Sequence, residues 1–363
     1  MSGSESERIL FAGGGTAGHL MPAINIATEM TKMNRKIKPL FVGKKGGMEQ
    51  DIVGRYGYEI EEIDVIGMKR TPRGVIRFIM NWNTGNKQAM KIIREYDPAI
   101  VIGTGGYVSA PIIRAAHKMK KRIFLQEQNS LPGLALRSVA RYADIIFIAY
   151  DSARSYFDES KCCLTGNPIR TDIGNRDPVK SKGKFGLDVK KKTLLVLGGS
   201  SGASSINETV SKLVSDFTHD DWQLLWQTGN RDYNRYYEKT TGKVRGALFP
   251  FIDDMPSAYA AADLVLSRAG AMALSEITAA GLPSVLIPYP HATGDHQTMN
   301  ARVLEKAGAA VVVAESEINL KLKAALDKMM TNDIERSRIG KAAGAIGNPD
   351  AAREIAKTIL ERI

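Results

Sequence analysis

Three observations in the sequence predict an α/β protein built from two Rossmann-like domains with parallel sheets. The chain has 363 residues, more than a single hydrophobic core usually serves. Short β-branched runs alternate with amphipathic stretches, which is typical of parallel βαβ units. The alternation restarts after a Lys/Gly-rich stretch at 177–192, so the second half repeats the first. We therefore expect ligands at the carboxyl ends of the strands, in a cleft between two domains.

The strand-like runs fall into two sets, one in each half of the chain. In the first half we expect strands at 9–12, 39–42, 99–102, 123–126 and 144–149. In the second half we expect a strand from 193 onward and others at 222–227, 246–251, 263–267, 284–288 and 309–314. Helical stretches separate these runs, which favours one parallel sheet in each half.

The composition indicates a soluble globular protein with an acidic partner. Charges, glycines or prolines interrupt every apolar run before the roughly 18 residues that a membrane-spanning helix needs. The two cysteines, Cys162 and Cys163, are sequence neighbours that rarely bridge, so a reducing compartment is expected. The net charge of +11 indicates a nucleic acid, a phosphorylated small molecule or an anionic membrane surface as partner. Because no nucleic-acid-binding signature is present, nucleic acid is not expected.

Both halves open with a strand, a glycine-rich turn and the start of a helix, at 10–19 and 195–204. Glycines let the backbone approach an anion and the first helical N–H groups point at it, so each turn is a candidate phosphate cradle. Gly13, Gly15 and Gly18 also fit the G-x-G-x-x-G pattern of nicotinamide dehydrogenases. That alternative is disfavoured, because residues 38–41 hold no carboxylate for the ribose hydroxyls.

His19 directly follows the first turn, at the start of the expected helix. An imidazole titrates near neutrality, and a helix N-terminus favours its neutral, proton-accepting form. The sequence therefore predicts a general base. The alternative is a histidine that only caps or packs the turn.

Two further segments of the first half place polar residues after a strand. GTGGYVSAP at 103–111 offers Tyr107 and Ser109 as anion or sugar contacts before Pro111, which we expect to begin a helix. A cluster of amides and one acid follows the next strand: Gln126, Glu127, Gln128 and Asn129. Such a cluster suits a hydroxyl-rich ligand, and capping of a loop is the alternative.

In the second half, Arg268 and Gly270 follow a strand, and Glu276 lies one or two turns into the next helix. A carboxylate there can accept both hydrogen bonds of a ribose diol, whereas a solvated glutamate on a helix surface is the alternative. After the next strand come His291, Asp295, His296, Gln297 and Asn300, with Asp295 at a helix start. Because no H-E-x-x-H or Cys/His spacing is present, no metal site is predicted. A G-x-S-x-G nucleophile turn is also missing from the sequence.

Basic and apolar residues interleave between Lys69 and Arg94. The other cations are Arg70, Arg73, Arg77, Lys87 and Lys91, and the apolar neighbours are Val75, Ile76, Phe78, Ile79, Met80 and Trp82. Such a mixture suits the surface of an anionic bilayer. The alternative is an apolar face that packs in the core while the cations are solvated.

Together these motifs resemble the MurG family, the UDP-N-acetylglucosamine:lipid I N-acetylglucosaminyltransferases of bacterial peptidoglycan synthesis. The similar blocks follow in order along nearly the whole chain, at 14–23, 103–111, 127–133, 165–170, 198–203, 251–255, 267–290 and 296–301. The resemblance implies a GT-B fold with an acceptor-binding, membrane-facing domain at 7–168 and a UDP-GlcNAc-binding domain at 169–346. It also implies that a C-terminal helix at about 347–363 packs back on the first domain.

By the same resemblance, the enzyme is an inverting glycosyltransferase that moves N-acetylglucosamine from UDP-GlcNAc to the C4 hydroxyl of MurNAc in lipid I. His19 is the implied catalytic base, and no metal or other cofactor is implied. The implied donor site consists of Thr16, Ala17, Gly18, Asn129, Arg170, Ser200, Ile252, Arg268, Ala271, Met272, Ala273, Leu274, Ser275, Glu276, His296 and Gln297. Within it, Glu276 would hold the ribose. The candidates on the acceptor side are Gly14, Tyr107 and Glu127.

The resemblance further implies roles in cell shape, cell division and the cell cycle. It implies a peripheral position at the cytoplasmic face of the inner membrane, with the anionic membrane surface and other cell-wall synthesis proteins as partners. The sequence departs from the family pattern at Ala17, Gln126, Ser201 and Ala273, where Gly, His, Gln and Thr are frequent. The alternatives are another GT-B lipid glycosyltransferase, a UDP-sugar epimerase and a non-catalytic binding module.

Overall fold

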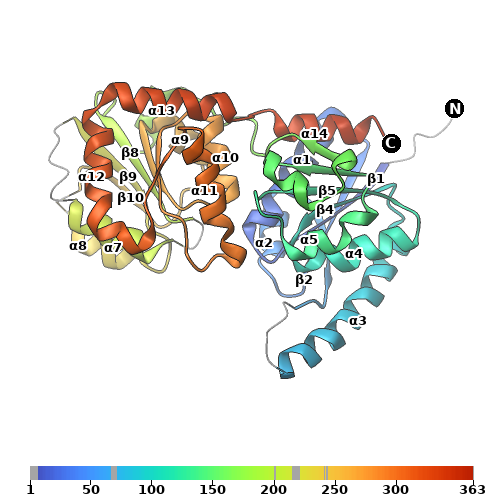
Figure 1. The fold of residues 1–363 in the computed structure, drawn as a ribbon. Coiled ribbons are helices and arrows are strands. Elements are labelled where there is room, and N and C mark those ends of the chain that lie inside the picture. The colour runs from blue at the N-terminus through green and yellow to red at the C-terminus, as the bar shows by residue number, and fades with distance from the viewer. Residues whose placement is uncertain are drawn as a thin grey trace. The chain divides into compact units, whose positions relative to one another are not determined.

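The structure, a computed structural model, describes residues 7–66, 72–199, 202–214, 221–240, 242 and 244–362, and no side chains between 72 and 80. Two compact units divide the chain. The first unit comprises Met1–Ile169 and Asp350–Ile363, and the second unit comprises Arg170–Pro349. Each unit has a parallel sheet flanked by helices, so the predicted fold class is confirmed (Figure 1).

In the described part of the first unit, a seven-stranded parallel sheet has the order β3-β2-β1-β4-β5-β6-β7. Its strands are β1 (Glu7–Gly13), β2 (Ile37–Lys44), β3 (Glu59–Ile63), β4 (Ile100–Gly105), β5 (Arg122–Glu127), β6 (Ile145–Ile148) and β7 (Cys162–Leu164). The order reverses between β1 and β4, which are neighbours in the sheet. The turns that follow these two strands therefore lead to opposite faces, and ligands of such sheets bind where they diverge.

Helices cover both faces of the first sheet because alternate strand residues point to opposite sides. These helices are α1 (Ala17–Met33), α2 (Glu49–Arg55), α3 (Pro72–Tyr96), α4 (Gly106–Lys118), α5 (Leu134–Val139) and α14 (Ala351–Leu360). Ile9 and Phe11 pack in one core with Ile355 and Ile359 of α14, whereas Leu10 packs in the other core with residues of α3 and α4. The chain thus returns to the first unit at its end, where α14 packs along α1 (Figure 1).

In the described part of the second unit, a six-stranded parallel sheet has the order β10-β9-β8-β11-β12-β13. Its strands are β8 (Lys192–Leu197), β9 (Trp222–Gln227), β10 (Gly246–Phe249), β11 (Leu264–Ser267), β12 (Ser284–Leu286) and β13 (Val311–Val312). The helices are α6 (Pro178–Lys184), α7 (Ser204–Leu213), α8 (Tyr233–Thr240), α9 (Met255–Ala261), α10 (Ala271–Ala279), α11 (His296–Lys306), α12 (Ile318–Thr331) and α13 (Asp333–Ile346). The strand order reverses between β8 and β11, as it does between β1 and β4 in the first unit.

Two short strands and one helix start differ from the sequence expectations. The strands β3 and β7 lie at the edges of the first sheet. Glutamates interrupt the apolar pattern of β3, and β7 has only three residues. The expectation that Pro111 begins a helix was wrong, because α4 begins at Gly106 and contains Pro111 in its interior. Gly105 and Gly106 have φ values of +105° and +77°, which lets the chain turn from β4 directly into the helix.

The two cysteines lie next to each other on the edge strand β7 and are both free thiols. Cys162 packs against the core under α4, and Cys163 packs against the core under α1. Every helix in the described residues is too short or too polar to span a bilayer.

Candidate active site

The turn after β1 places His19 in the first turn of α1. Thr16 is the N-terminal capping residue of this helix, and its carbonyl accepts the backbone N–H of His19 at 3.2 Å. The Thr16 hydroxyl also lies 3.1 Å from Nδ1 of His19. Thr104, at the end of β4, donates its hydroxyl to the His19 carbonyl at 2.7 Å. Both the backbone and the imidazole of His19 are therefore held by neighbouring residues.

The turn after β4 interlocks with the turn after β1. A Cβ on Gly105 would lie 2.7 Å from Cδ2 of His19, and a Cβ on Gly106 would overlap the carbonyl oxygen of Gly14. Glycine is required at both positions for packing as well as for positive φ. The imidazole of His19 consequently rests against the bare backbone of Gly105.

Ser109 is fully buried and forms hydrogen bonds to the backbone of the same turn. Its hydroxyl accepts the N–H of Gly105 at 3.0 Å and lies 2.7 Å from the carbonyl oxygen of Ala12, to which it can donate. The expectation that Ser109 contacts an anion or a sugar was wrong, because this hydroxyl is used inside the fold. Tyr107 is 53% exposed and is the side chain of this segment that reaches solvent.

The polar cluster after β5 mainly organises its own loop. The carboxyl group of Glu127 accepts backbone N–H groups of Asn129 at 2.9 Å and Gly133 at 3.1 Å. Burial raises the pKa of Glu127, and these hydrogen bonds lower it in part. Gln128 donates to the carbonyl of Thr104 at 2.8 Å, and Gln126 donates to Asn167 at 3.0 Å. The loop-capping alternative therefore applies to Gln126, Glu127 and Gln128, whereas Asn129 is half-exposed.

Glu276 of α10 has the surroundings of a site residue. Its side chain is only 13% exposed, so the alternative of a solvated glutamate was wrong. Tyr259 donates its hydroxyl to Glu276 at 3.0 Å, and the Arg170 guanidinium lies 3.9 Å away. Burial raises the pKa of Glu276, and Arg170 opposes that rise. Arg170 in turn donates to the Asp253 carbonyl at 3.4 Å, while its buried Nε makes no hydrogen bond to the described residues.

Arg268 acts as a framework residue in the second unit. Its guanidinium bonds both carboxylate oxygens of Glu315, at 2.8 and 3.1 Å, and donates to Ser205 at 2.9 Å. It also donates to the carbonyls of Ile287 and Pro288 after β12. The side chain of Arg268 is thus bound on several sides by protein groups, which leaves the backbone after β11 for ligand contacts.

Gln297 and Gln227 tie together the turns that surround the expected donor site. Oε1 of Gln297 accepts the N–H groups of Ala269 at 3.2 Å and Tyr289 at 3.0 Å. Oε1 of Gln227 accepts the N–H of Ile252 at 2.8 Å, and its Nε2 donates to the carbonyl of Gly199 at 3.1 Å. The sequence analysis missed Gln227, although a glutamine that ends the buried strand β9 is itself a signal.

The expected site residues form two groups, one in each unit, in the turns after strands and in the helices that follow them. The first unit holds Gly14, Thr16, Ala17, Gly18, His19, Tyr107, Glu127 and Asn129 after β1, β4 and β5. The second unit holds Arg170, Ile252, Arg268, Ala271, Met272, Ala273, Leu274, Ser275, Glu276, His296 and Gln297. Ile252, Ala271 and Leu274 are buried, and His296 is half-buried with Nδ1 2.6 Å from the Thr293 carbonyl. Ser200 and Ser201 lie outside the described residues.

The described residues contain no group of three or more His, Cys, Asp or Glu side chains that could hold a metal ion. Asp295 directly precedes α11 and has a left-handed φ of +56°, as the N-terminal capping residue of this helix. The carboxyl group of Asp295 also accepts the hydroxyl of Thr298 in the first turn of this helix at 2.7 Å.

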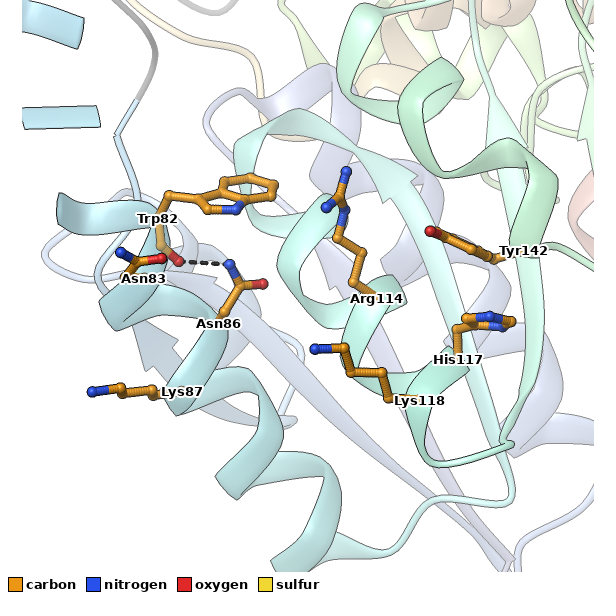
Figure 2. Close-up of a pocket in the computed structure, with 8 residues that line it drawn as sticks. All are labelled: Trp82, Asn83, Asn86, Lys87, Arg114, His117, Lys118 and Tyr142. Carbon is orange, nitrogen blue, oxygen red and sulfur yellow. Dashed lines mark hydrogen bonds between the residues drawn. The ribbon is translucent and has the colours of Figure 1, made fainter. Parts of the chain in front are cut away.

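A pocket of about 500 Å³ lies on the first unit between α3, α4 and the residues around Tyr142 (Figure 2). It is lined by Trp82, Asn83, Asn86, Lys87, Arg114, His117, Lys118 and Tyr142. The Arg114 guanidinium stands 5.2 Å from the ring centre of Trp82, and His117 stacks on Tyr142 with centroids 4.2 Å apart. Nε of Arg114 is buried and makes no hydrogen bond to the described residues.

The basic segment at 69–94 is described only in part. Lys69 and Arg70 lie outside the described residues, and so do the side chains of Arg73, Val75, Ile76, Arg77, Phe78, Ile79 and Met80. In the later turns of α3, Ile92 and Ile93 pack in the core, while Lys91 and Arg94 are exposed. The alternative of a packed apolar face with solvated cations therefore applies to these turns.

Both halves of the chain match domains of the same protein family. The glycosyltransferase family 28 N-terminal domain matches residues 9–148, and the C-terminal domain of the same family matches residues 193–359. A UDP-N-acetylglucosamine--N-acetylmuramyl-(pentapeptide) pyrophosphoryl-undecaprenol N-acetylglucosamine transferase of Listeria welshimeri is 37% identical, over 97% of this chain and 99% of its own. The transferase of the same name from Caldicellulosiruptor saccharolyticus is 38% identical, over 97% of both chains.

Solved structures agree on the fold. The crystal structure of Acinetobacter baumannii MurG is similar with a TM-score of 0.78 at 24% identity, covering 98% of this chain and 99% of that one. The MnaA–UDP structure of S. aureus is similar with a TM-score of 0.70 at 14% identity, covering 98% of each chain. At these identities the two structures support the fold alone.

Proposed function

The chain belongs to glycosyltransferase family 28, and we infer that it transfers N-acetylglucosamine from UDP-N-acetylglucosamine to lipid I, forming lipid II for peptidoglycan synthesis. One observation carries this function: relatives that are 37% and 38% identical, over 97% of this chain, bear the name of that transferase. The chain is thus a UDP-GlcNAc-dependent glycosyltransferase. This assignment replaces the nicotinamide dehydrogenase considered for Gly13, Gly15 and Gly18.

We propose His19 as the general base of an inverting displacement. The C4 hydroxyl oxygen of MurNAc attacks the anomeric carbon, the bond from that carbon to UDP breaks, and the hydroxyl proton passes to the imidazole. Nδ1 lies 3.1 Å from the Thr16 hydroxyl, so in the neutral ring we assign the N–H to Nδ1, which donates to that oxygen. The lone pair of Nε2 is then left to receive the acceptor proton, and Gly105 leaves room beside this atom. Fixing the ring in this way supports a base, since a positioned base needs little reorganisation at the moment of reaction.

The donor is proposed to bind to the second unit, with Glu276 accepting hydrogen bonds from the ribose hydroxyls. Tyr259 and Arg170 fix the orientation of its carboxyl group. The chain turns from β11 into α10 at Gly270, and the backbone N–H groups of the first helical turn suit a uracil edge or a phosphate. The buried Ile252 then offers an apolar surface for the base.

We further propose that transfer needs no metal ion or other cofactor. Helix N-termini after β8, β11 and β12 and the cation of Arg170 supply positive charge for the leaving UDP. Turnover should therefore be the same within about twofold after dialysis against EDTA as before it. Restoration of lost activity by Mg²⁺ or Mn²⁺ would contradict this part of the proposal.

Peripheral binding to an anionic membrane is proposed for α3 and the pocket beside it. Lys87, Arg114 and Lys118 gather beside the aromatic rings of Trp82 and Tyr142, a mixture that suits a lipid–water interface (Figure 2). Each cation near an anionic leaflet is worth about 1 kcal/mol. The variant R70Q/R73Q/R77Q should bind anionic vesicles up to about a hundredfold more weakly at low salt, whereas K180Q/K190Q/K306Q in the second unit should bind like wild type. Equal cosedimentation of all three proteins would contradict the membrane proposal.

One assay tests the reaction itself. Incubating the protein with lipid I and UDP-GlcNAc that is labelled in the sugar should move the label into a lipid fraction. Formation of UDP-ManNAc without an acceptor would favour the epimerase, and UDP binding without turnover would favour a non-catalytic module. Transfer to a different lipid acceptor but not to lipid I would favour another lipid glycosyltransferase.

A further inference from the structure

Glu49 is a buried acidic residue that the proposed reaction does not use. It is the first residue of α2 and is only 1% exposed. Its carboxyl oxygen Oε1 accepts the backbone N–H of Gly15 at 2.6 Å, across 34 positions of the chain. Gly15 lies in the turn that carries Thr16 and His19, so Glu49 supports the proposed base from a different element.

Three glycines surround this side chain and make room for it. A Cβ on Gly14 would overlap Oε1, and a Cβ on Gly47 would overlap Oε2. A Cβ on Gly43 would come within 2.9 Å of the Cβ of Glu49. Close approach of a carboxyl group to two separate backbone segments therefore requires glycine at positions that belong to β2, the loop after it and the β1–α1 turn.

This arrangement changes the role of the first glycine-rich turn. The N–H of Gly15, which the sequence suggested for cradling a phosphate, already donates to Glu49. A phosphate at this turn would therefore find this donor in use. The turn is therefore suited to holding a side chain in place and unsuited to binding an anion at Gly14 and Gly15.

We propose that Glu49 is a positioning residue that locks the β1–α1 turn and thereby sets the position of the His19 imidazole. The proposal rests on the proposed function, because the base matters only for the transfer reaction. Its physical basis is that a base displaced by about 1 Å can lose up to about a hundredfold in rate, although substrate binding is unchanged. The requirement is for a hydrogen-bond acceptor of the shape of a glutamate side chain.

Four variants test this requirement with purified full-length protein, lipid I and UDP-GlcNAc. E49A removes the acceptor. G47A keeps the glutamate, but the added methyl group would overlap Oε2 and displace the carboxyl group. E49Q keeps an acceptor oxygen and the side-chain shape. G54A is the matched control, since it adds the same methyl group within α2, where a Cβ meets nothing within 4 Å.

We expect kcat to fall about ten- to a hundredfold in E49A and G47A, with the KM of both substrates within about twofold of wild type. E49Q and G54A should stay within about threefold of the wild-type kcat. In an H19A background, E49A should cause no further loss, because Glu49 acts through His19. Thermal unfolding of each variant identifies any that fail to fold, and G47A and E49Q then still decide the question.

Three results would overturn the proposal. The first is an unchanged kcat in folded E49A and G47A, and the second is a full additional loss of kcat when E49A is combined with H19A. The third is a raised KM for lipid I at unchanged kcat, which would make the turn part of the acceptor-binding surface. A wild-type protein that forms no lipid II would contradict the proposed function instead, independently of Glu49.

Discussion

The β1–α1 and β8–α7 turns share the pattern of strand, glycines and helix, yet different side chains support them. In the first turn, the carboxyl group of Glu49 takes the N–H of Gly15. In the second, the amide of Gln227 donates to the carbonyl of Gly199, and the acid beside the start of α7, Asp232, accepts the side-chain hydroxyl of Ser204 at 2.8 Å. A carboxyl group that accepts a backbone N–H of the turn occupies a donor that a phosphate would need. An amide that donates to a carbonyl of the turn leaves the N–H groups available. We infer that the side chain bonded to the backbone of a glycine-rich turn determines whether the turn can bind a phosphate.

The largest effect should come from His19, which belongs to the turn supported by an acid. H19A should lower kcat by about a hundred- to ten-thousandfold, because it removes the proposed base. UDP affinity, measured by calorimetry, should stay within about twofold of wild type. H117A serves as control, since His117 lies on α4 and stacks on Tyr142 at the separate pocket. Loss of UDP affinity in H19A would mean that His19 contacts the UDP-sugar donor. Both turns would then serve donor binding.

A smaller effect is expected at Glu276, on the side of the donor. E276A should weaken UDP binding about ten- to a hundredfold, since hydrogen bonds to a charged group are worth about 1.5–3 kcal/mol. At saturating UDP-GlcNAc, kcat should fall much less than in H19A. E238A, on the exposed side of α8, is the control. Unchanged UDP affinity in a folded E276A protein would show that the ribose is held elsewhere.

Gln227 tests the second turn directly. Q227A removes the hydrogen bonds to Gly199 and Ile252, each worth about 0.5–1.5 kcal/mol, so UDP affinity should fall about two- to tenfold. Q223A is the matched control, because Gln223 lies on the same strand and bonds Asp188 and Thr193 instead. A larger loss of kcat than of UDP affinity in Q227A would contradict the idea that this turn serves donor binding.

The sequence predicted the fold class well, because the patterns of strands and helices are local. Alternating strands and helices determine parallel sheets, and parallel strands bring the loops at their carboxyl ends together. Edge strands such as β3 and β7 escaped notice, since acidic residues or shortness hide their apolar pattern.

Long-range partners of single side chains could not be predicted from local patterns. The contact of Glu49 with Gly15 spans 34 positions, and the pairing of Arg268 with Glu315 spans 47. A helix-start glutamate and an arginine after a strand each fit several roles until the packing is known. For this reason the sequence did not identify Glu315 as the partner of Arg268 and did not single out Glu49.

The smallest expected effect concerns Glu127, a second acid that works inside the first unit. Burial raises its pKa above the ordinary value of 4.5, so the folded state binds this proton more tightly than the unfolded state. The stability linked to Glu127 is therefore fully present below pH 4.5 and is lost as the pH rises through the raised pKa. Each tenfold difference in proton affinity between the two states is worth about 1.4 kcal/mol.

E127Q removes the titratable group. Denaturant unfolding of wild type and variant between pH 4.5 and pH 8 measures how the free energy of unfolding of each protein depends on pH. Placing an amide beside the N–H groups of Asn129 and Gly133 changes the free energy of unfolding by the same amount at each pH. This amount therefore does not affect how the difference between the two proteins changes with pH. The free energy of unfolding of wild type minus that of E127Q should therefore decrease across this range. E238Q, an exposed control, should give a flat difference. A difference for E127Q that stays flat or increases would contradict this prediction, because the hydrogen bonds of the loop would then outweigh burial in setting the pKa of Glu127.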